Sequence, residues 1–196
     1  IAMMLNIKEN IEEIVKTLPE GVRLIAVSKT KPVEYIEEAY AGGQRAFGEN
    51  RPQEMAAKYR QLPKDIEWHM IGYLIHLNRL PSVPPANEGV WISTQKMQKE
   101  YSLKLLQKID REALKNERMI DCLLEFHIAE EETKSGLDWE EACRLLESDE
   151  FKVLEHIRIV GVMGIATYTE DREQIRKEFR ELHRIFGLLK ATYFQE

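Results

Sequence analysis

Residues 24–32 read Leu-Ile-Ala-Val-Ser-Lys-Thr-Lys-Pro, so an apolar run leads directly into Lys29 and stops before Pro32. The run predicts a strand over 22–28 that is covered on both faces, as the strands of parallel sheets are. Lys29 then lies at the carboxyl end of that strand, where α/β proteins bind their ligands. Desolvation at the end of an apolar strand lowers the pKa of a lysine, and the charge of Lys31 acts in the same direction. An uncharged amine can attack an aldehyde; the alternative is a lysine that only ends the strand and reaches water.

The same strand and helix unit recurs along the chain. Helical spacing of apolar residues predicts helices over 7–18, 33–40, 52–60, 101–115, 139–146 and 172–194. Further strands are predicted over 45–47, 66–71, 119–128 and 157–163, with 48–50 as a loop. Such alternation gives either an open doubly wound sheet or a closed (β/α) barrel. Polar or reactive residues follow several different strands, which favours the barrel, because its loops surround one pocket.

Composition limits the classes of function. A chain of 196 residues with 43% apolar residues suits one domain with a substantial core. A net charge of −6 without a basic stripe argues against nucleic acid as a partner. No apolar run is long enough for a membrane helix, and Cys122 and Cys143 lack the spacing of a metal or redox motif. We therefore expect a cytoplasmic protein with neither a membrane nor a nucleic-acid partner, whose two cysteines are small packing residues.

Residues 73–101 differ from the rest of the chain. They include Pro81, Pro84, Pro85 and Gly89 and show no sustained hydrophobic period. This pattern is typical of an irregular segment, either a lid or a linker. We assign no site residue there.

Five segments in chain order resemble the family of pyridoxal phosphate homeostasis proteins, which is related to the N-terminal barrel of alanine racemase. They are AVSKTKP at 26–32, FGEN at 47–50, WHMIG at 68–72, HIAEEETKSGL at 127–137 and GVMGIAT at 161–167. The resemblance covers 5–72 and about 102–194. A single short motif would be weak evidence, but five in order are specific.

The resemblance implies a single (β/α)8 barrel domain over 1–196, of the TIM type found at the N-terminus of alanine racemase, with an extra N-terminal helix. It also implies an aldimine between Lys29 and pyridoxal 5′-phosphate (PLP). The residues expected around the cofactor are Lys29, Asn50, His69, Gly72, Met163 and Gly164. The alternatives are that Asn50 only caps the following helix and that His69 is a structural residue.

Members of the family usually continue with two more βα units, whose loops bind the cofactor phosphate. Because this sequence stops at Glu196, we expect a barrel without its last βα units and without that phosphate site. Residues 161–164 with Thr167 are a possible partial substitute. The alternative is that the Gly-x-x-Gly pattern is only a tight turn.

The function implied is that of a monomeric PLP carrier without significant turnover. A racemase needs a second acid or base on the far face of the substrate carbon, and the chain has no room for the domain that supplies it. Two alternatives stay open: a Schiff-base lyase or aldolase that uses Lys29 without PLP, and a weak PLP-dependent racemase. PLP-dependent apoenzymes are possible partners, recruited by the charged run 130–134, although such runs are usually solvated loops.

Overall fold

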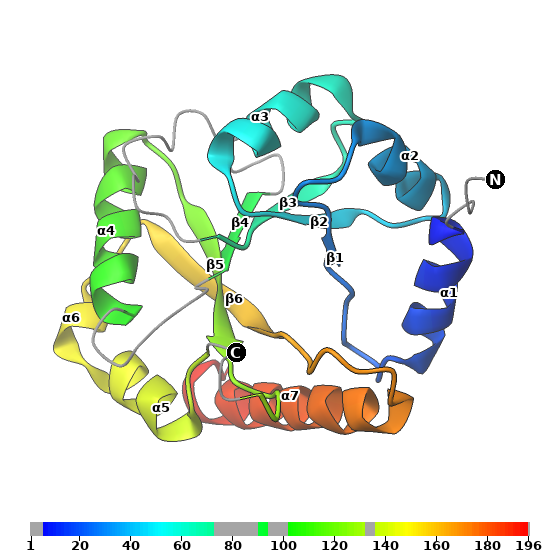
Figure 1. Ribbon diagram of the computed structural model, residues 1–196. Coiled ribbons are helices and arrows are strands. Elements are labelled where there is room, and N and C mark those ends of the chain that lie inside the picture. The colour runs from blue at the N-terminus through cyan, green and yellow to red at the C-terminus, as the bar shows by residue number, and fades with distance from the viewer. Residues whose placement is uncertain (1–5, 73–89, 94–101, 132–135, 196) are drawn as a thin grey trace.

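A computed structural model describes residues 6–72, 90–93, 102–131 and 136–195 (Figure 1). Its strands are β1 (Ala26–Val27), β2 (Ala46–Glu49), β3 (Glu67–Met70), β4 (Val90–Ser93), β5 (Ile120–Phe126) and β6 (Ile157–Gly164). They form one parallel sheet in chain order, so each strand pairs with the next. Within the described residues, β1 and β6 are the outer strands of this sheet.

Helices surround the strands on the outside (Figure 1). They are α1 (Ile7–Thr17), α2 (Val33–Ala41), α3 (Pro52–Gln61), α4 (Ser102–Lys115), α5 (Trp139–Glu147), α6 (Asp149–Lys152) and α7 (Arg172–Tyr193). A parallel order with crossover helices on one face is the geometry of a barrel wall. The predicted barrel class is therefore confirmed, and α1 is the predicted N-terminal helix.

Two separate apolar clusters distinguish the outer face of the sheet, which packs against the helices, from its inner face. The large cluster lies between the strands and the helices and contains Phe47, Met55 and Trp68, each almost fully buried. The smaller one consists of Ile71, Leu123 and Met163, with Ile25, Val160 and Ile165 packed against it. Because successive residues of a strand face opposite sides, Trp68 and Met70 lie on the outer face of β3 and His69 and Ile71 on the inner face.

The structure corrects several predicted boundaries. Strand β1 covers only two residues of the predicted 22–28, although the Ser28 N–H continues its ladder to the Gly48 oxygen. Strand β2 extends through Glu49, so Gly48 and Glu49 are not in a loop as predicted. Pairing with neighbouring strands sets where β1 and β2 end, and the local sequence does not show that pairing.

Two further corrections concern segments whose elements were missed. Strand β4 lies within 73–101, which was predicted to be irregular, and it forms the middle of the sheet between β3 and β5. The remaining residues of that segment lie outside the described part of the chain. The short helix α6 was also not predicted.

The cysteines and the helices agree with the predictions made from the composition. Cys122 is fully buried, and burial raises the pKa of its thiol, so it is a packing residue; Cys143 is half-buried. None of the helices in the described ranges has the length and apolar character needed to span a bilayer.

Candidate functional site

A cavity of about 440 Å³ lies on the inner face of the sheet. Its volume is within the range of about 300–1,000 Å³ that is usual for small-molecule sites. The walls are mostly apolar and come from the region of β1, β3, β5, β6 and α7, including Ile25, Val27, His69, Ile71, Leu123, Met163, Gly164 and Phe179. Such a cavity can hold an aromatic ring and keep water from it.

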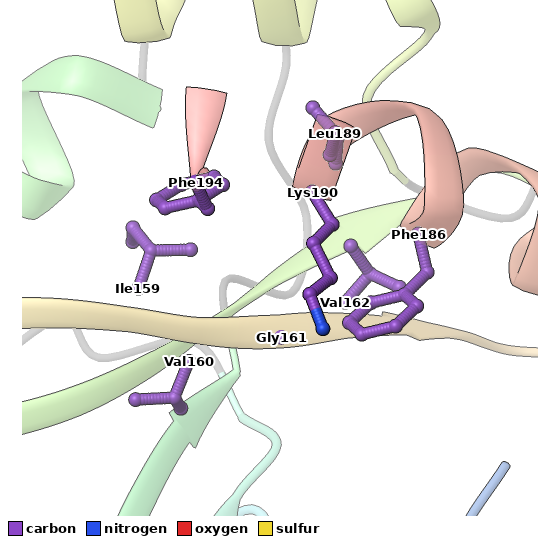
Figure 2. Close-up of a pocket in the computed structure, with 8 residues that line it drawn as sticks. All are labelled: Ile159, Val160, Gly161, Val162, Phe186, Leu189, Lys190 and Phe194. Atoms are coloured by element: carbon purple, nitrogen blue, oxygen red, sulfur yellow. The ribbon is translucent and has the colours of Figure 1, made fainter. Parts of the chain in front are cut away.

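A second hollow of about 210 Å³ lies between β6 and α7 (Figure 2). Lys190 and Phe186 extend toward β6 from the helix, and Leu189 and Phe194 complete its apolar side. It shares Phe186 and the β6 segment 160–162 with the larger cavity. None of the predicted site residues lines it, so the larger cavity is the candidate site.

Lys29 follows β1 at the carboxyl end of the strand, as predicted. It is exposed, so the predicted desolvation of this lysine is wrong: the strand ends two residues earlier and Lys29 lies in a turn. Its neighbour Ser28 is buried and hydrogen-bonded to Glu49 on the outer face of the sheet. Lys29 lies in the turn that follows β1, two residues after Val27, and Val27 lines the cavity. Lys29 itself is not among the residues that line the cavity.

Asn50 and Gly72 meet at the carboxyl ends of β2 and β3. The Ile71 N–H donates to the Glu49 oxygen at 2.8 Å, and a Cβ atom on Gly72 would lie 2.2 Å from the Asn50 oxygen. The side-chain oxygen of Asn50 is buried without a hydrogen-bond partner among the described residues. The helix-capping alternative for Asn50 is wrong, because Arg51 occupies the N-cap position of α3.

His69 lies on the inner face of β3 and lines the cavity. Its side chain is 4% exposed, and burial lowers the pKa of the imidazole to about 3, with a smaller contribution from the positive charge of Arg23. The ring is therefore neutral at physiological pH. A neutral imidazole can exchange hydrogen bonds with a ligand without adding charge to an apolar site.

Met163 and Gly164 also line the cavity, but they end strand β6 and do not form the predicted turn. Gly164 contacts Ile128 closely: a Cβ atom there would lie 2.7 Å from the Ile128 Cδ1 atom. The Gly-x-x-Gly segment is thus extended strand, and the tight-turn alternative is wrong.

Thr167 is not available to a phosphate group. Its N–H and hydroxyl donate to the two carboxylate oxygens of Glu178, at 2.7 and 2.6 Å, and its hydroxyl accepts the Glu130 N–H. Glu178 is buried, and a carboxylate beside a phosphate would repel it. The donors of Thr167 are therefore already engaged within the protein.

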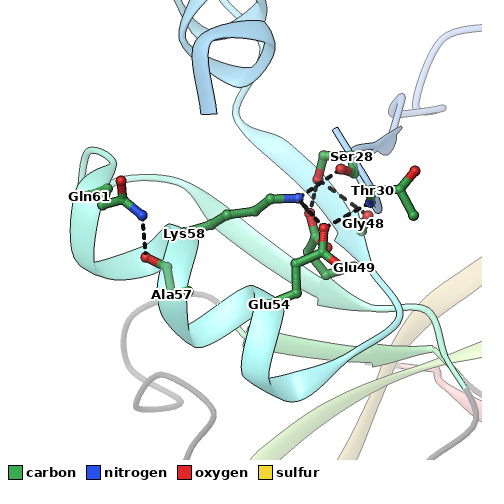
Figure 3. A network of polar contacts seen from close by, with 8 residues as sticks. All are labelled: Ser28, Thr30, Gly48, Glu49, Glu54, Ala57, Lys58 and Gln61. Atoms are coloured by element: carbon green, nitrogen blue, oxygen red, sulfur yellow. Dashed lines mark hydrogen bonds and ion pairs between the residues drawn. The ribbon is translucent and has the colours of Figure 1, made fainter. Parts of the chain in front are cut away.

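A buried ionic network next to Lys29 was missed from the sequence (Figure 3). The Lys58 ammonium lies 2.7 Å from an oxygen of Glu49 and 2.7 Å from an oxygen of Glu54. The spacing of Glu54 and Lys58, four residues apart on a helix, was a visible signal for the pair. Its connection to Glu49 depends on the packing of α3 against β2, which the sequence pattern does not show.

Comparison with known proteins agrees with this geometry. The family model for the alanine racemase N-terminal domain matches residues 4–196. A pyridoxal phosphate homeostasis protein of Pasteurella multocida is 33% identical over 95% of this chain and 78% of its own length. The chain belongs to the family of pyridoxal phosphate homeostasis proteins. A homeostasis protein of Aquifex aeolicus is also 33% identical, over 87% of this chain and 71% of its own length.

Solved structures of the family share the fold. PipY of Synechococcus elongatus PCC7942, solved without PLP, superposes with a TM-score of 0.69 at 29% identity, covering 96% of this chain and 84% of PipY. PipY has also been solved with PLP bound, and that structure superposes with a TM-score of 0.64. Alanine racemase of Clostridium difficile 630 has a TM-score of 0.66 at 16% identity, which shows the shared fold alone.

Proposed function

We propose that this chain binds pyridoxal 5′-phosphate through Lys29 and acts in the homeostasis and delivery of that cofactor without significant turnover. The main support is the position of Lys29 at the carboxyl end of β1, two residues after Val27, which lines the inner cavity. Relatives named as pyridoxal phosphate homeostasis proteins, and PipY with PLP bound, support the same cofactor.

The residues of the cavity fit the ring end of this cofactor. When bound, pyridoxal phosphate supplies an aldehyde with which a lysine amine can condense. Ile71 and Met163 provide apolar walls for an aromatic ring, and neutral His69 can exchange a hydrogen bond with it. Asn50 does not line the cavity, but its buried side-chain oxygen at the end of β2 is an acceptor without a hydrogen-bond partner among the described residues.

The absence of turnover is part of the proposal. General acid–base catalysis works best when the pKa of the catalytic group is near the working pH. Among the described residues that line the cavity, His69 is the buried titratable group. With a pKa of about 3 it is a weak base, and its charged, proton-donating form is not populated at neutral pH. We therefore propose that residues 1–196 act as one monomeric binding domain that passes PLP to apoenzymes.

The test is spectroscopic. Purified protein mixed with PLP is expected to absorb in the visible range, to lose that absorption with borohydride, and to gain the mass of one reduced cofactor. In this step the Lys29 amine forms a C=N bond as the aldehyde oxygen leaves as water, and borohydride supplies the hydride that reduces it. Lys29→Ala should abolish both signals, and Lys31→Ala is the matched control that should retain them.

The remaining functions give different results in the same experiment. If Lys29→Ala keeps the full absorption and adduct, the assignment of Lys29 is wrong. Trapping of a keto acid or sugar phosphate on Lys29 by a protein that does not bind PLP would instead support a lyase. Exchange of the α-proton of alanine by the PLP-loaded protein would show racemase activity, and we expect none.

A further inference from the structure

The turn that carries Lys29 is held from the outside of the barrel by one buried ammonium group. Lys58, on α3, donates to the main-chain oxygen of Ser28 at 2.9 Å as well as to Glu49 and Glu54. Its side chain is 7% exposed and that of Glu49 is fully buried. Figure 3 shows the lysine reaching from the helix across to the end of β1. Little water competes with these bonds, so each restrains its partner strongly.

The network ends on the residues on both sides of Lys29. On one side, the Ser28 hydroxyl donates to Glu49 at 2.6 Å, and on the other, the Thr30 N–H donates to Glu54 at 2.8 Å. Thr30 has a φ of 64°, a conformation that β-branched residues rarely adopt. The bond to Glu54 compensates for this conformation. The backbone on each side of Lys29 is therefore fixed, while the Lys29 side chain is exposed.

The same turn contains a second exposed lysine. Lys31 lies two residues after Lys29, and its N–H donates to the Ser28 oxygen, the atom that also accepts from Lys58. An unrestrained turn could present either amine to the cavity. The Lys31 N–H bond to the Ser28 oxygen closes a turn in which Lys29 is a central residue and Lys31 is the last one. Bonds that fix the backbone at Ser28 and Thr30 therefore hold the two amines at different, defined positions in the turn.

We propose that Lys58, acting through Glu49 and Glu54, is a positioning residue that fixes the turn at Ser28–Thr30 and thereby selects Lys29 over Lys31 for attachment of the cofactor. The inference deepens the proposed function and rests on it. It assigns a role to charged residues that lie on the opposite side of the sheet from the cavity.

Glu54→Ala and Glu54→Gln form the decisive pair. The alanine variant removes the acceptor of the Thr30 N–H, whereas glutamine keeps an oxygen there. Gln61→Ala is the control on the same helix, because the Gln61 side chain is exposed and donates only to the Ala57 oxygen within α3. Each protein is titrated with PLP by absorbance, reduced with borohydride and digested, and the adduct is mapped to Lys29 or Lys31 by mass spectrometry.

In the native protein and in Gln61→Ala we expect the adduct on Lys29 alone. Glu54→Ala should weaken PLP binding about tenfold, the usual effect of one lost hydrogen bond, and should move a measurable share of the adduct to Lys31. Glu54→Gln should restore the selectivity. Loss of stability alone would not change which lysine is labelled.

A Glu54→Ala variant with native affinity and with the adduct only on Lys29 would overturn the positioning role. If Glu54→Ala does not fold, Ser28→Ala takes its place, because it removes the hydroxyl bonds to Glu49 and to the Gly48 oxygen and leaves the main chain intact. Native affinity and selectivity in that variant would then overturn the inference. If the native protein forms no Lys29 adduct, the proposed function fails, and the selection of Lys29 fails with it.

Discussion

Gly72 lies directly against the main chain of Asn50: a Cβ atom at position 72 would stand 2.2 Å from the Asn50 oxygen and 2.6 Å from its Cα atom. The ends of β2 and β3 approach this closely only because position 72 has no side chain. The contact places the buried side-chain oxygen of Asn50 at the carboxyl edge of the sheet. Gly72 is not among the residues that line the cavity, so what the structure shows of it is this contact with Asn50.

Gly72→Ala should force these two strand ends apart. We expect the free energy of unfolding to fall by about 1–3 kcal/mol, the usual cost of overpacking, and PLP binding to weaken. Gly187→Ala on α7 is the matched control, because a Cβ atom there meets nothing within 4 Å. That variant should be more stable by about 0.5–1 kcal/mol, since alanine is favoured over glycine inside a helix. Chemical denaturation measures both, and equal stability of the two variants would contradict the close contact.

Asn50→Ala should separate binding from stability. The Asn50 side-chain oxygen has no hydrogen-bond partner in the described part of the protein, so its removal should change the free energy of unfolding by less than about 1 kcal/mol. PLP affinity should fall about tenfold if this oxygen accepts a bond from the ligand. Asn116→Ala is the control with the opposite expected result. It removes a 2.7 Å hydrogen bond from the Asn116 side chain to the Glu112 main-chain oxygen, so stability should fall while PLP affinity stays the same. Native PLP affinity in Asn50→Ala would remove Asn50 from the site.

His69 should make stability depend on pH in the mildly acidic range. Its pKa is about 3 in the folded protein because of burial, against about 6.5 when unfolded, so below pH 6.5 the unfolded chain binds a proton that the folded protein does not. Stability should therefore fall as the pH decreases, by roughly 3 kcal/mol between about pH 6.5 and about pH 4. Urea unfolding across this range should show a smaller decrease for His69→Gln than for the native protein. His183→Gln, at an exposed position of α7, should behave as the native protein does.

Glu178 should be essential to the segment that follows β6. Its carboxylate accepts both the N–H and the hydroxyl of Thr167, and Glu178 is 4% exposed. Glu178→Ala would leave the Thr167 N–H without its partner, and we expect a loss of about 1–3 kcal/mol of stability. Glu181→Ala, three residues further along α7, removes only an exposed ion pair with Arg184 and should cost less than about 1 kcal/mol. Similar losses in thermal denaturation of the two variants would contradict the role given to Glu178.

The alternation of strands and helices was evident from the chain, because long amphipathic helices such as α7 and α4 carry a strong local period. Short strands were less well predicted. Strand β4 is in the middle of the sheet, yet the surrounding Pro-rich sequence suggested an irregular segment. Glu49 was predicted to lie in a loop, but it is a buried residue of β2. The Lys58 ammonium and the Ser28 hydroxyl, from two other segments of the chain, stabilise its buried carboxylate.

The sequence by itself determined the alternation of strands and helices and the lysine at the end of β1, because hydrophobic period is a local property of a chain. Its five short motifs indicated the family, and through that resemblance the barrel. Only the tertiary structure shows that His69 is buried and neutral and that Thr167 is hydrogen-bonded to Glu178. It also shows that Gly72 packs against the main chain of Asn50. It also connected Lys58 to both sides of Lys29. These relationships join residues from different strands and helices, and their distances, burial and pKa values exist only once the sheet and its helices have packed together.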